Sequence, residues 1–254
     1  MTTEVTVDVQ PPAAIITLNR PKVRNAITPE MIDELRGVIT ELNHRDDVRA
    51  IVLTGADPAF CAGLDLVAVG EGRFSRAADW DKRPFDGVLE TTKPLIGAIN
   101  GATVTGGLEW ALCCDFRIAS ERARFADTHA RVGVMPGGGL TWRLPRAVGF
   151  AWARQMSFTG NYVDAAQALR IGLVNEVVPH ESLLPRALEI AANIATIPAG
   201  DLADIRAMYH QSELGTAVDA ATNEREVARR RRLNADEVAS RRSSVIERGR
   251  GQIG

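Results

Sequence analysis

Two continuous apolar segments, each followed by a turn that contains glycine, set the limits on the fold of this chain. Residues 50–54 (AIVLT) and 95–99 (LIGAI) lack the alternation of polar and apolar residues that a half-exposed strand shows. Such segments indicate strands that are buried on both faces of a sheet. A third strand is expected at residues 116–119. Because sheets of this kind are covered by helices, the sequence predicts an α/β core.

Helix signals occur between these strands and dominate the end of the chain. Residues 5–9 and 14–18 predict two short strands joined by a turn at Pro11 and Pro12. Thr28, Pro29 and Glu30 form a helix start, and that helix is expected to run to about residue 43. After about residue 180 the pattern is purely helical, with helices expected at 182–196, 200–211, 216–233 and 236–248. The sequence therefore predicts a core over residues 1–195 and a helical region over residues 196–254.

Composition excludes several classes of partner. The chain has 254 residues, and 30 Lys and Arg against 32 Asp and Glu give a net charge of −2. This balance gives no field that would attract nucleic acid or an anionic membrane. Three cysteines, an odd number, argue against a disulfide framework. With no signal peptide and no apolar run of about 20 residues, a cytoplasmic location and no membrane partner are expected.

The two glycine-bearing turns are candidates for anion binding. They cover residues 59–66 and 100–109, and each lies between a buried strand and a helix. Backbone N–H groups at a helix start have no partner within the helix and lie at the positive end of the helix dipole, where negative charge is favoured. Two converging turns would form an oxyanion hole, which stabilises a developing negative oxygen. Glycines after strands are usually tight turns, and the turns alone favour that interpretation over anion binding.

Five sequence blocks resemble one enzyme family in order and spacing. They are NRPKVRNAIT, FCAGLDL, INGATVTGGLEWALCCDFRIAS, RVGVMPGGGLTWRLPRAVG and FTGNYVDAAQALRIGLVNEVVP, within roughly residues 10–195. Together they resemble the crotonase (enoyl-CoA hydratase/isomerase) family. The resemblance implies a crotonase-like ββα spiral core with a helical C-terminal region that serves as a lid or in oligomerisation.

The resemblance also assigns residues to the binding of an acyl-CoA thioester. The backbone N–H groups of Leu64 and Gly106 match the two donors that hold the thioester oxygen in the family. The residues that match the family's coenzyme A contacts are Lys22, Arg24, Ala62, Asp65, Leu66 and Val67. Hydratases often carry lysine where Val67 stands, so one contact with the coenzyme is expected to be missing. The segment 71–92 falls where family members shape the acyl pocket.

The candidate catalytic residues are Glu109 and His129. Glu109 matches the first catalytic glutamate of the family, whereas His129 stands where hydratases carry a second glutamate. Hydration needs a base for water and an acid for Cα, or one group that does both, and Glu109 is expected to be the principal acid/base. A histidine with an ordinary pKa near 6.5 could assist by passing a proton to Cα or by orienting the water. The alternative interpretation is that His129 is an inactive replacement.

The function that the resemblance favours is hydration of trans-2-enoyl-CoA to 3-hydroxyacyl-CoA. Two alternatives stay open: an enoyl-CoA isomerase that uses Glu109 alone, and an accessory protein that binds acyl-CoA without chemistry. The resemblance implies a homotrimer or a dimer of trimers. It implies no metal and no cofactor besides the coenzyme A of the substrate. His44, His180 and His210 have no partner motif and are expected at the surface.

Overall fold

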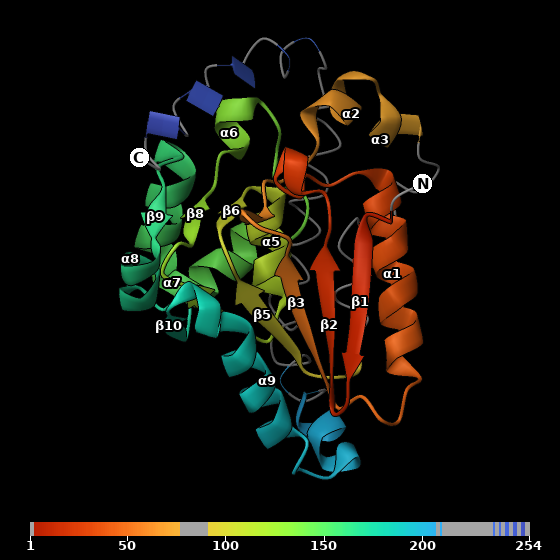
Figure 1. Ribbon diagram of the computed structural model, residues 1–254. Coiled ribbons are helices and arrows are strands. Elements are labelled where there is room, and N and C mark those ends of the chain that lie inside the picture. The colour runs from red at the N-terminus through yellow and green to blue at the C-terminus, as the bar shows by residue number, and fades with distance from the viewer. Residues whose placement is uncertain are drawn as a thin grey trace.

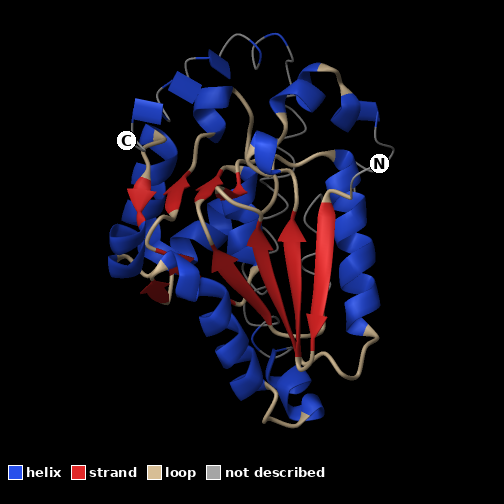
Figure 2. Cartoon of the chain, in the orientation of Figure 1, coloured by secondary structure: helices blue, strands red, loops and turns tan. Residues whose placement is uncertain are grey.

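The computed structural model describes residues 3–76 and 91–206, together with 209, 236, 239, 242, 243, 246, 247, 250 and 251. Within them, two sheets form the core (Figures 1 and 2). The strands of the larger sheet are β1 (Val5–Gln10), β2 (Ala13–Leu18), β3 (Ala50–Gly55), β5 (Leu95–Ile99), β7 (Phe116–Ser120) and β10 (Glu176–Val178). Those of the smaller sheet are β4 (Ala59–Cys61), β6 (Ala102–Val104), β8 (Arg124–Ala126) and β9 (Val163–Asp164).

Helices lie between and around the strands. They are α1 (Pro29–Asn43), α2 (Leu66–Gly70), α3 (Arg73–Arg76), α5 (Gly106–Cys113), α6 (His129–Val132), α7 (Leu140–Thr159), α8 (Ala165–Arg170) and α9 (Leu183–Ile194). Two short 3-10 helices are η1 (Pro21–Val23) and η2 (His180–Ser182). No helix in the described ranges combines the length and the apolar character that crossing a membrane requires.

Three successive segments of the chain repeat one pattern. Each contributes a strand to the larger sheet, then a strand to the smaller sheet, then a helix: β3–β4–α2, β5–β6–α5 and β7–β8–α6. The strands β3, β5 and β7 are parallel neighbours in the larger sheet, and β4, β6 and β8 are parallel neighbours in the smaller one. The predicted ββα spiral is therefore confirmed. The three-residue strands of the smaller sheet were not predicted.

The larger sheet is buried on both faces, as its continuous apolar strands predict. Side chains such as Ile51 pack with α1 on one face, and Val52, its neighbour in β3, packs with α9 on the other. Figure 1 shows these two helices on either side of the sheet. Helix α1 begins as expected, because the Met31 N–H donates to the Thr28 hydroxyl at 3.1 Å and Pro29 occupies the first turn.

The chain after β10 is helical as far as it is described. The helix predicted at 182–196 corresponds to α9, and residues 199–206 are also helical. The helix predicted at 216–233, most of the one at 236–248, and most of the segment 71–92 lie outside the described residues. The predicted boundary between a core and a C-terminal region at residue 195 stays a prediction.

Candidate functional site

The two glycine-bearing turns meet at the end of the smaller sheet. They follow β4 and β6, which are parallel neighbours. A methyl group built on Gly63 would lie 3.3 Å from the Gly106 nitrogen, and one built on Gly106 would lie 3.8 Å from the Leu64 nitrogen. The sequence folds this way because Gly63 has φ +88°, a region that side chains disfavour. Gly107 allows close packing of α5 on β4, since a methyl there would lie 2.1 Å from the Cys61 carbonyl oxygen.

The N–H groups of Leu64 and Gly106 have no acceptor within the described ranges. On either side of Leu64 the backbone is paired, because the Ile27 N–H donates to the Gly63 carbonyl at 2.8 Å and the Asp65 N–H donates to the Ile27 carbonyl at 2.9 Å. Gly106 is the first residue of α5, where helix geometry leaves the N–H without a partner in the helix. The structure thus brings together the two donors that the sequence predicted.

Glu109 lies in the first turn of α5 and is buried, with 2% of its surface exposed. Its Oε1 accepts hydrogen bonds from the backbone N–H groups of Gly138 at 2.8 Å and Leu140 at 3.4 Å. Its Oε2 lies 3.6 Å from His129 Nε2. Glu109 is therefore not a solvated carboxylate, although it stands at the start of a helix. One oxygen is fixed by the start of α7, and the other faces the second candidate catalytic residue.

His129 is the first residue of α6 and is also buried. Its ring Nδ1 lies 2.7 Å from Asp127 Oδ1, and the same oxygen accepts the His129 backbone N–H at 3.1 Å. Burial alone would lower the pKa of His129, but the charge of Glu109 and the hydrogen bond to Asp127 outweigh it and raise the pKa to about 10. Burial also acts on Asp127, yet the His129 contacts lower the pKa of that carboxyl. This raised pKa favours the protonated form of His129 at neutral pH, and the ring lies between the side chains of Glu109 and Asp127.

The residues expected to contact coenzyme A lie around the first turn. The side chains of Lys22, Arg24 and Val67 are exposed. The backbone of Arg24 reaches the turn, because its carbonyl accepts the Ala62 N–H at 3.0 Å. Leu66 and Val67 begin α2 beside them. This grouping is what a binding surface for the coenzyme would need, and the contacts themselves stay a prediction.

Asp65 is the expected coenzyme contact whose side chain has other partners. Its Oδ1 accepts the N–H groups of Val67 and Ala68 at 3.0 and 3.2 Å, which caps α2. Its Oδ2 forms an ion pair with Arg20 at 2.9 Å. The side chain therefore holds the first turn in place. The backbone of Asp65 is also paired, because its N–H donates to the Ile27 carbonyl and its carbonyl accepts the Val69 N–H, both at 2.9 Å.

Sequence reasoning missed part of the site. Asp127 was not among the predicted site residues, although its position two residues before His129 is a usable signal. Residues 136–139 were not among them either, yet the Gly138 N–H of this loop donates to Glu109. His180, expected at the surface without a partner, is half-buried between the Ser120 hydroxyl and Asp57 Oδ2, each at 3.0 Å. His44 is exposed as expected, and His210 lies outside the described residues.

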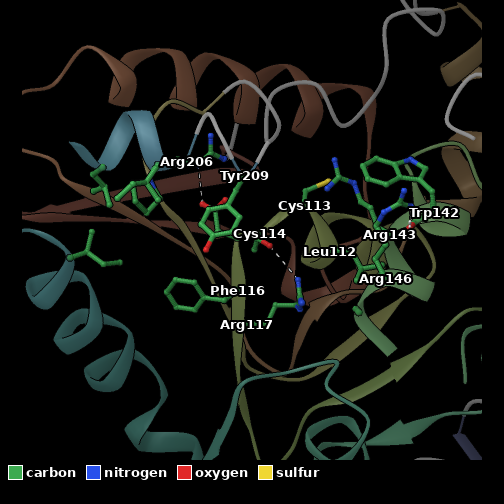
Figure 3. Close-up of a pocket in the computed structure, with 16 residues that line it drawn as sticks. Leu112, Cys113, Cys114, Phe116, Arg117, Trp142, Arg143, Arg146, Arg206 and Tyr209 are labelled. Atoms are coloured by element: carbon green, nitrogen blue, oxygen red, sulfur yellow. Dashed lines mark hydrogen bonds and ion pairs between the residues drawn. The ribbon is translucent and has the colours of Figure 1, made fainter. Parts of the chain in front are cut away.

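A separate cavity of about 520 Å³ lies at the other end of α5. Figure 3 shows that guanidinium groups and aromatic rings from several elements point into it, among them Arg117, Arg143 and Trp142. Cys113 and Cys114, at the end of α5, contribute to the same wall. Neither Glu109 nor His129 lines this cavity. Among the described residues, no three His, Cys, Asp or Glu side chains are grouped as metal ligands would be.

Paired backbone amides beside a buried carboxylate are the arrangement that an oxyanion hole would require. The family model for enoyl-CoA hydratase/isomerase matches residues 10–244. A crotonyl-CoA hydratase from Syntrophomonas wolfei is 38% identical over 185 residues, which cover 71% of each chain. A short-chain-enoyl-CoA hydratase from Clostridium acetobutylicum is 40% identical over 187 residues, which cover 72% of each. This chain belongs to the enoyl-CoA hydratase/isomerase family.

A solved structure agrees with this assignment. The enoyl-CoA hydratase from Mycobacterium tuberculosis H37Rv superposes with a TM-score of 0.82 at 43% identity. The match covers 91% of this chain and all of that one. The crotonase fold expected from the sequence is therefore confirmed by the fold of a relative as well as by the repeat of strands and helices.

Proposed function

We propose that this protein adds water to trans-2-enoyl-CoA and forms 3-hydroxyacyl-CoA. The observation that carries the proposal is the position of Glu109, whose Oε2 faces the buried His129 while its helix also supplies the Gly106 N–H. Hydration needs two proton transfers next to a stabilised oxyanion. The names of the relatives from Syntrophomonas wolfei and Clostridium acetobutylicum, both hydratases, support the same reaction.

In this scheme the thioester oxygen accepts hydrogen bonds from the Leu64 and Gly106 N–H groups. These bonds draw electron density from the conjugated double bond and make Cβ electrophilic. They strengthen as the enolate oxygen becomes negative, so they stabilise the transition state more than the bound substrate. The first turn of α5 contributes further, because its dipole favours negative charge at that end.

Glu109 is the base for the attacking water, because its Oε2 faces His129 while its Oε1 is held by the N–H groups of Gly138 and Leu140. The water oxygen bonds to Cβ, its proton moves to Glu109, and the π electrons move to the enolate. The His129 imidazolium then gives the Nε2 proton to Cα, which completes the addition of water. Glu109 passes its proton to His129, and the site returns to its starting state. Glu109 Oε2 and His129 Nε2 lie 3.6 Å apart, so both groups can reach one water that binds beside them.

The coenzyme part of the substrate is assigned to the exposed surface around the first turn. Lys22 and Arg24 supply positive charge for its phosphates. Ala62, Asp65, Leu66 and Val67 are assigned the remaining contacts. No resident cofactor takes part in this scheme. A cytoplasmic homotrimer or dimer of trimers is proposed with it, and sedimentation of the full chain measures the assembly.

The presence of His129 beside Glu109 favours hydration over the two alternatives. An isomerase can move a proton between carbons with one carboxylate, and it needs no second acid. An accessory protein that only binds acyl-CoA needs neither group. A buried imidazolium between two carboxylates is costly to keep unless its charge is used or compensated. Here both carboxylates compensate it and one of them faces the proposed water.

The test is an assay of the full chain with crotonyl-CoA, longer 2-enoyl thioesters and 3-enoyl thioesters. Loss of absorbance from the conjugated thioester is the expected result. Appearance of that absorbance from the 3-enoyl substrate would indicate isomerisation, and tight binding without either change would indicate the accessory role. Either outcome would overturn the proposal.

Glu109→Gln tests the role of the carboxylate in the same assay. Glutamine keeps an oxygen for the Gly138 N–H, so the expected result is a kcat lower by about 10²–10⁴-fold with coenzyme A affinity retained. Glu41→Gln, an exposed change on α1, is the matched control and should leave kcat unchanged. Wild-type turnover in Glu109→Gln would remove Glu109 from the mechanism.

A further inference from the structure

The acid in the proposed scheme is a histidine, His129. The orientation of its ring depends on a residue that contacts neither water nor substrate in that scheme. We propose that Asp127 is a positioning residue that holds the His129 ring with Nδ1 protonated and Nε2 turned toward Glu109. The inference rests on the proposed function and refines it. It assigns the proton at Cα to an Asp127–His129 pair, where the family pattern has a single glutamic acid.

One oxygen of Asp127 fixes both parts of His129. Oδ1 accepts the backbone N–H at 3.1 Å and lies 2.7 Å from ring Nδ1. The Ser157 hydroxyl of α7 contacts the same carboxylate from another element. Only 5% of the His129 side chain and 3% of the Asp127 side chain are exposed. The ring therefore cannot rotate without breaking a buried hydrogen bond.

The contact also decides which ring nitrogen reacts. An ionised carboxylate only accepts hydrogen bonds, so Nδ1 must carry a proton. The proton that His129 can give or receive is then always the one on Nε2, which lies toward Glu109. In the Ser-His-Asp triad of hydrolases, a carboxylate fixes the tautomer of the catalytic histidine in the same way. Without Asp127, Nδ1 and Nε2 would compete for the proton.

A further hydrogen bond joins this segment to the oxyanion hole. The hydroxyls of Thr105 and Thr128 lie 2.6 Å apart, and the Thr128 N–H donates to the Thr105 hydroxyl at 3.3 Å. Thr105 directly precedes Gly106, and Thr128 directly precedes His129. The proton donor and one oxyanion donor are thus fixed relative to each other by two neighbouring residues.

The charges around the ring keep it protonated. The ionisable groups that act most strongly on His129 are Glu109 from α5 and Asp127 from its own segment, both negative. From α7, Ser157 is neutral, and the nearest cation on α6, Arg131, donates to the Thr159 carbonyl. The pKa of about 10 follows from these two carboxylates. His129 is then an acid throughout the neutral range, and activity is lost as pH rises through the pKa of the ring.

The first test is Asp127→Asn, followed by the pH dependence of His129 in the free protein. Asparagine keeps an oxygen for the backbone N–H and removes only the charge. With labelled histidine, the NMR titration midpoint of His129 should fall by about one to three pH units relative to wild type. His129→Gln identifies the signal among the four histidines. The alkaline limb of the kcat profile should move in the same direction. An unchanged midpoint would overturn the proposal.

Ser157→Ala is the matched control for a merely structural effect. It removes the other side-chain partner of Asp127 without changing charge, so it should move the His129 midpoint by less than Asp127→Asn does. Equal shifts in the two variants would mean that packing, and not the carboxylate charge, sets the protonation of His129. That result would also overturn the proposal.

A second test uses His129→Glu, which restores the glutamate of the family pattern. In wild type, Asp127→Asn should lower kcat by about 10–100-fold, the size typical of a residue that orients a reacting ligand. In the His129→Glu background the same change should not lower kcat, because residue 129 would then be a carboxylate that Asp127 repels. Equal losses in both backgrounds would indicate a structural role. Where His129→Glu has no turnover, the NMR titration decides alone.

The outcomes separate this inference from the proposed function. If no variant and no wild-type sample hydrates any enoyl thioester, the proposed reaction fails, while the His129 midpoint still reports whether Asp127 controls the ring. If hydration is observed but the midpoint does not respond to Asp127→Asn, the reaction stands and the role of Asp127 fails.

Discussion

Helix α5 meets a different environment at each of its two ends. At its N-terminus, the Gly106 N–H has no acceptor in the described ranges and the Glu109 carboxylate lies in the first turn. At its C-terminus, Arg117 donates to the carbonyls of Ala111 at 3.4 Å and Cys114 at 3.2 Å. A helix dipole favours negative charge at the first end and positive charge at the second. The Gly106 N–H at one end is left for an acceptor, whereas the carbonyls at the other end accept hydrogen bonds from a side chain.

The two ends of this eight-residue helix therefore have different roles: the first serves the reaction, and the second serves the stability of the fold. Open N–H groups weaken the fold slightly and can stabilise an oxyanion, because they need no reorganisation when charge develops. The carbonyls at the C-terminal end already accept hydrogen bonds from Arg117. Arg117 belongs to β7 and also donates its Nε–H to the Leu173 carbonyl at 2.7 Å, so it anchors the helix to both segments. Changes at the first end should therefore alter turnover, and changes at the second should alter the free energy of unfolding.

Gly106→Ala should have the largest effect, and it should act mainly on turnover. The new methyl would lie 3.8 Å from the Leu64 nitrogen and 3.3 Å from Ile27 Cδ1, where the thioester oxygen is expected to bind. Loss of this geometry should lower kcat/KM by about 10²–10³-fold, the cost of one oxyanion donor. The φ of Gly106 is not in the left-handed region, so the cost to stability comes from the tight contact with the end of the Ile27 side chain and should be small. Steady-state kinetics and urea unfolding measure the two effects.

Gly37→Ala is the matched control for that change. Gly37 is in the middle of α1, and a methyl there meets nothing within 4 Å. It should raise stability by about 0.5–1 kcal/mol and leave kcat/KM unchanged. If Gly106→Ala kept wild-type turnover, the thioester oxygen would not lie between the two turns.

The adjacent glycines Gly106 and Gly107 show how much of the site could be predicted from the sequence. Adjacent glycines after a strand predicted a tight turn and a possible anion site. They did not show which glycine allows close packing and which one faces the anion site. Gly107 packs α5 against the Cys61 carbonyl, whereas Gly106 faces Leu64. That division depends on where β4 lies relative to β6, which is a contact between residues more than forty positions apart in the chain. Local sequence carries no record of it.

Elements with local signals were predicted well. The cap of α1 at Thr28 and the apolar strand β5 are written in consecutive residues, and both were found where expected. The smaller sheet was missed because its strands have two or three residues, too few for a period of two to be detected. Asp127 was missed as a partner of His129 because the burial of an aspartate depends on the tertiary structure, which its residue type does not indicate.

Arg117→Met should produce the next largest effect, now on stability. Methionine fills similar space but leaves the carbonyls of Ala111, Cys114 and Leu173 without the donor that Arg117 provides. Removing a buried charged donor of this kind should cost about 2–4 kcal/mol in the free energy of unfolding. The kcat of the folded fraction should stay at the wild-type value, because the N-terminus of α5 is unchanged. Urea unfolding and active-site-normalised kinetics measure the two quantities.

Arg146→Met is the control from the same cavity. Arg146 is exposed and donates to the Trp142 carbonyl at 2.8 Å, so its loss should cost less than about 1 kcal/mol. A large fall in kcat for Arg117→Met at full stability would contradict the division between the two ends of α5, since it would mean that the C-terminal end acts on the site.

The smallest expected effect concerns the cysteine beside each end of the helix. A thiol near a helix N-terminus usually has a lowered pKa, which would make Cys61 the reactive one if the dipole dominated. Burial dominates instead and raises the pKa of Cys61 to about 12, and burial also raises the pKa of Cys114 well above its usual range. At pH 8 an alkylating reagent should therefore label neither thiol in the folded protein. Intact mass measures this directly, and the urea-unfolded chain, with all three cysteines labelled, is the control. Fast labelling of Cys61 alone would show that the turn around Leu64 opens in solution, and the two ends of α5 would then differ in mobility as well as in chemistry.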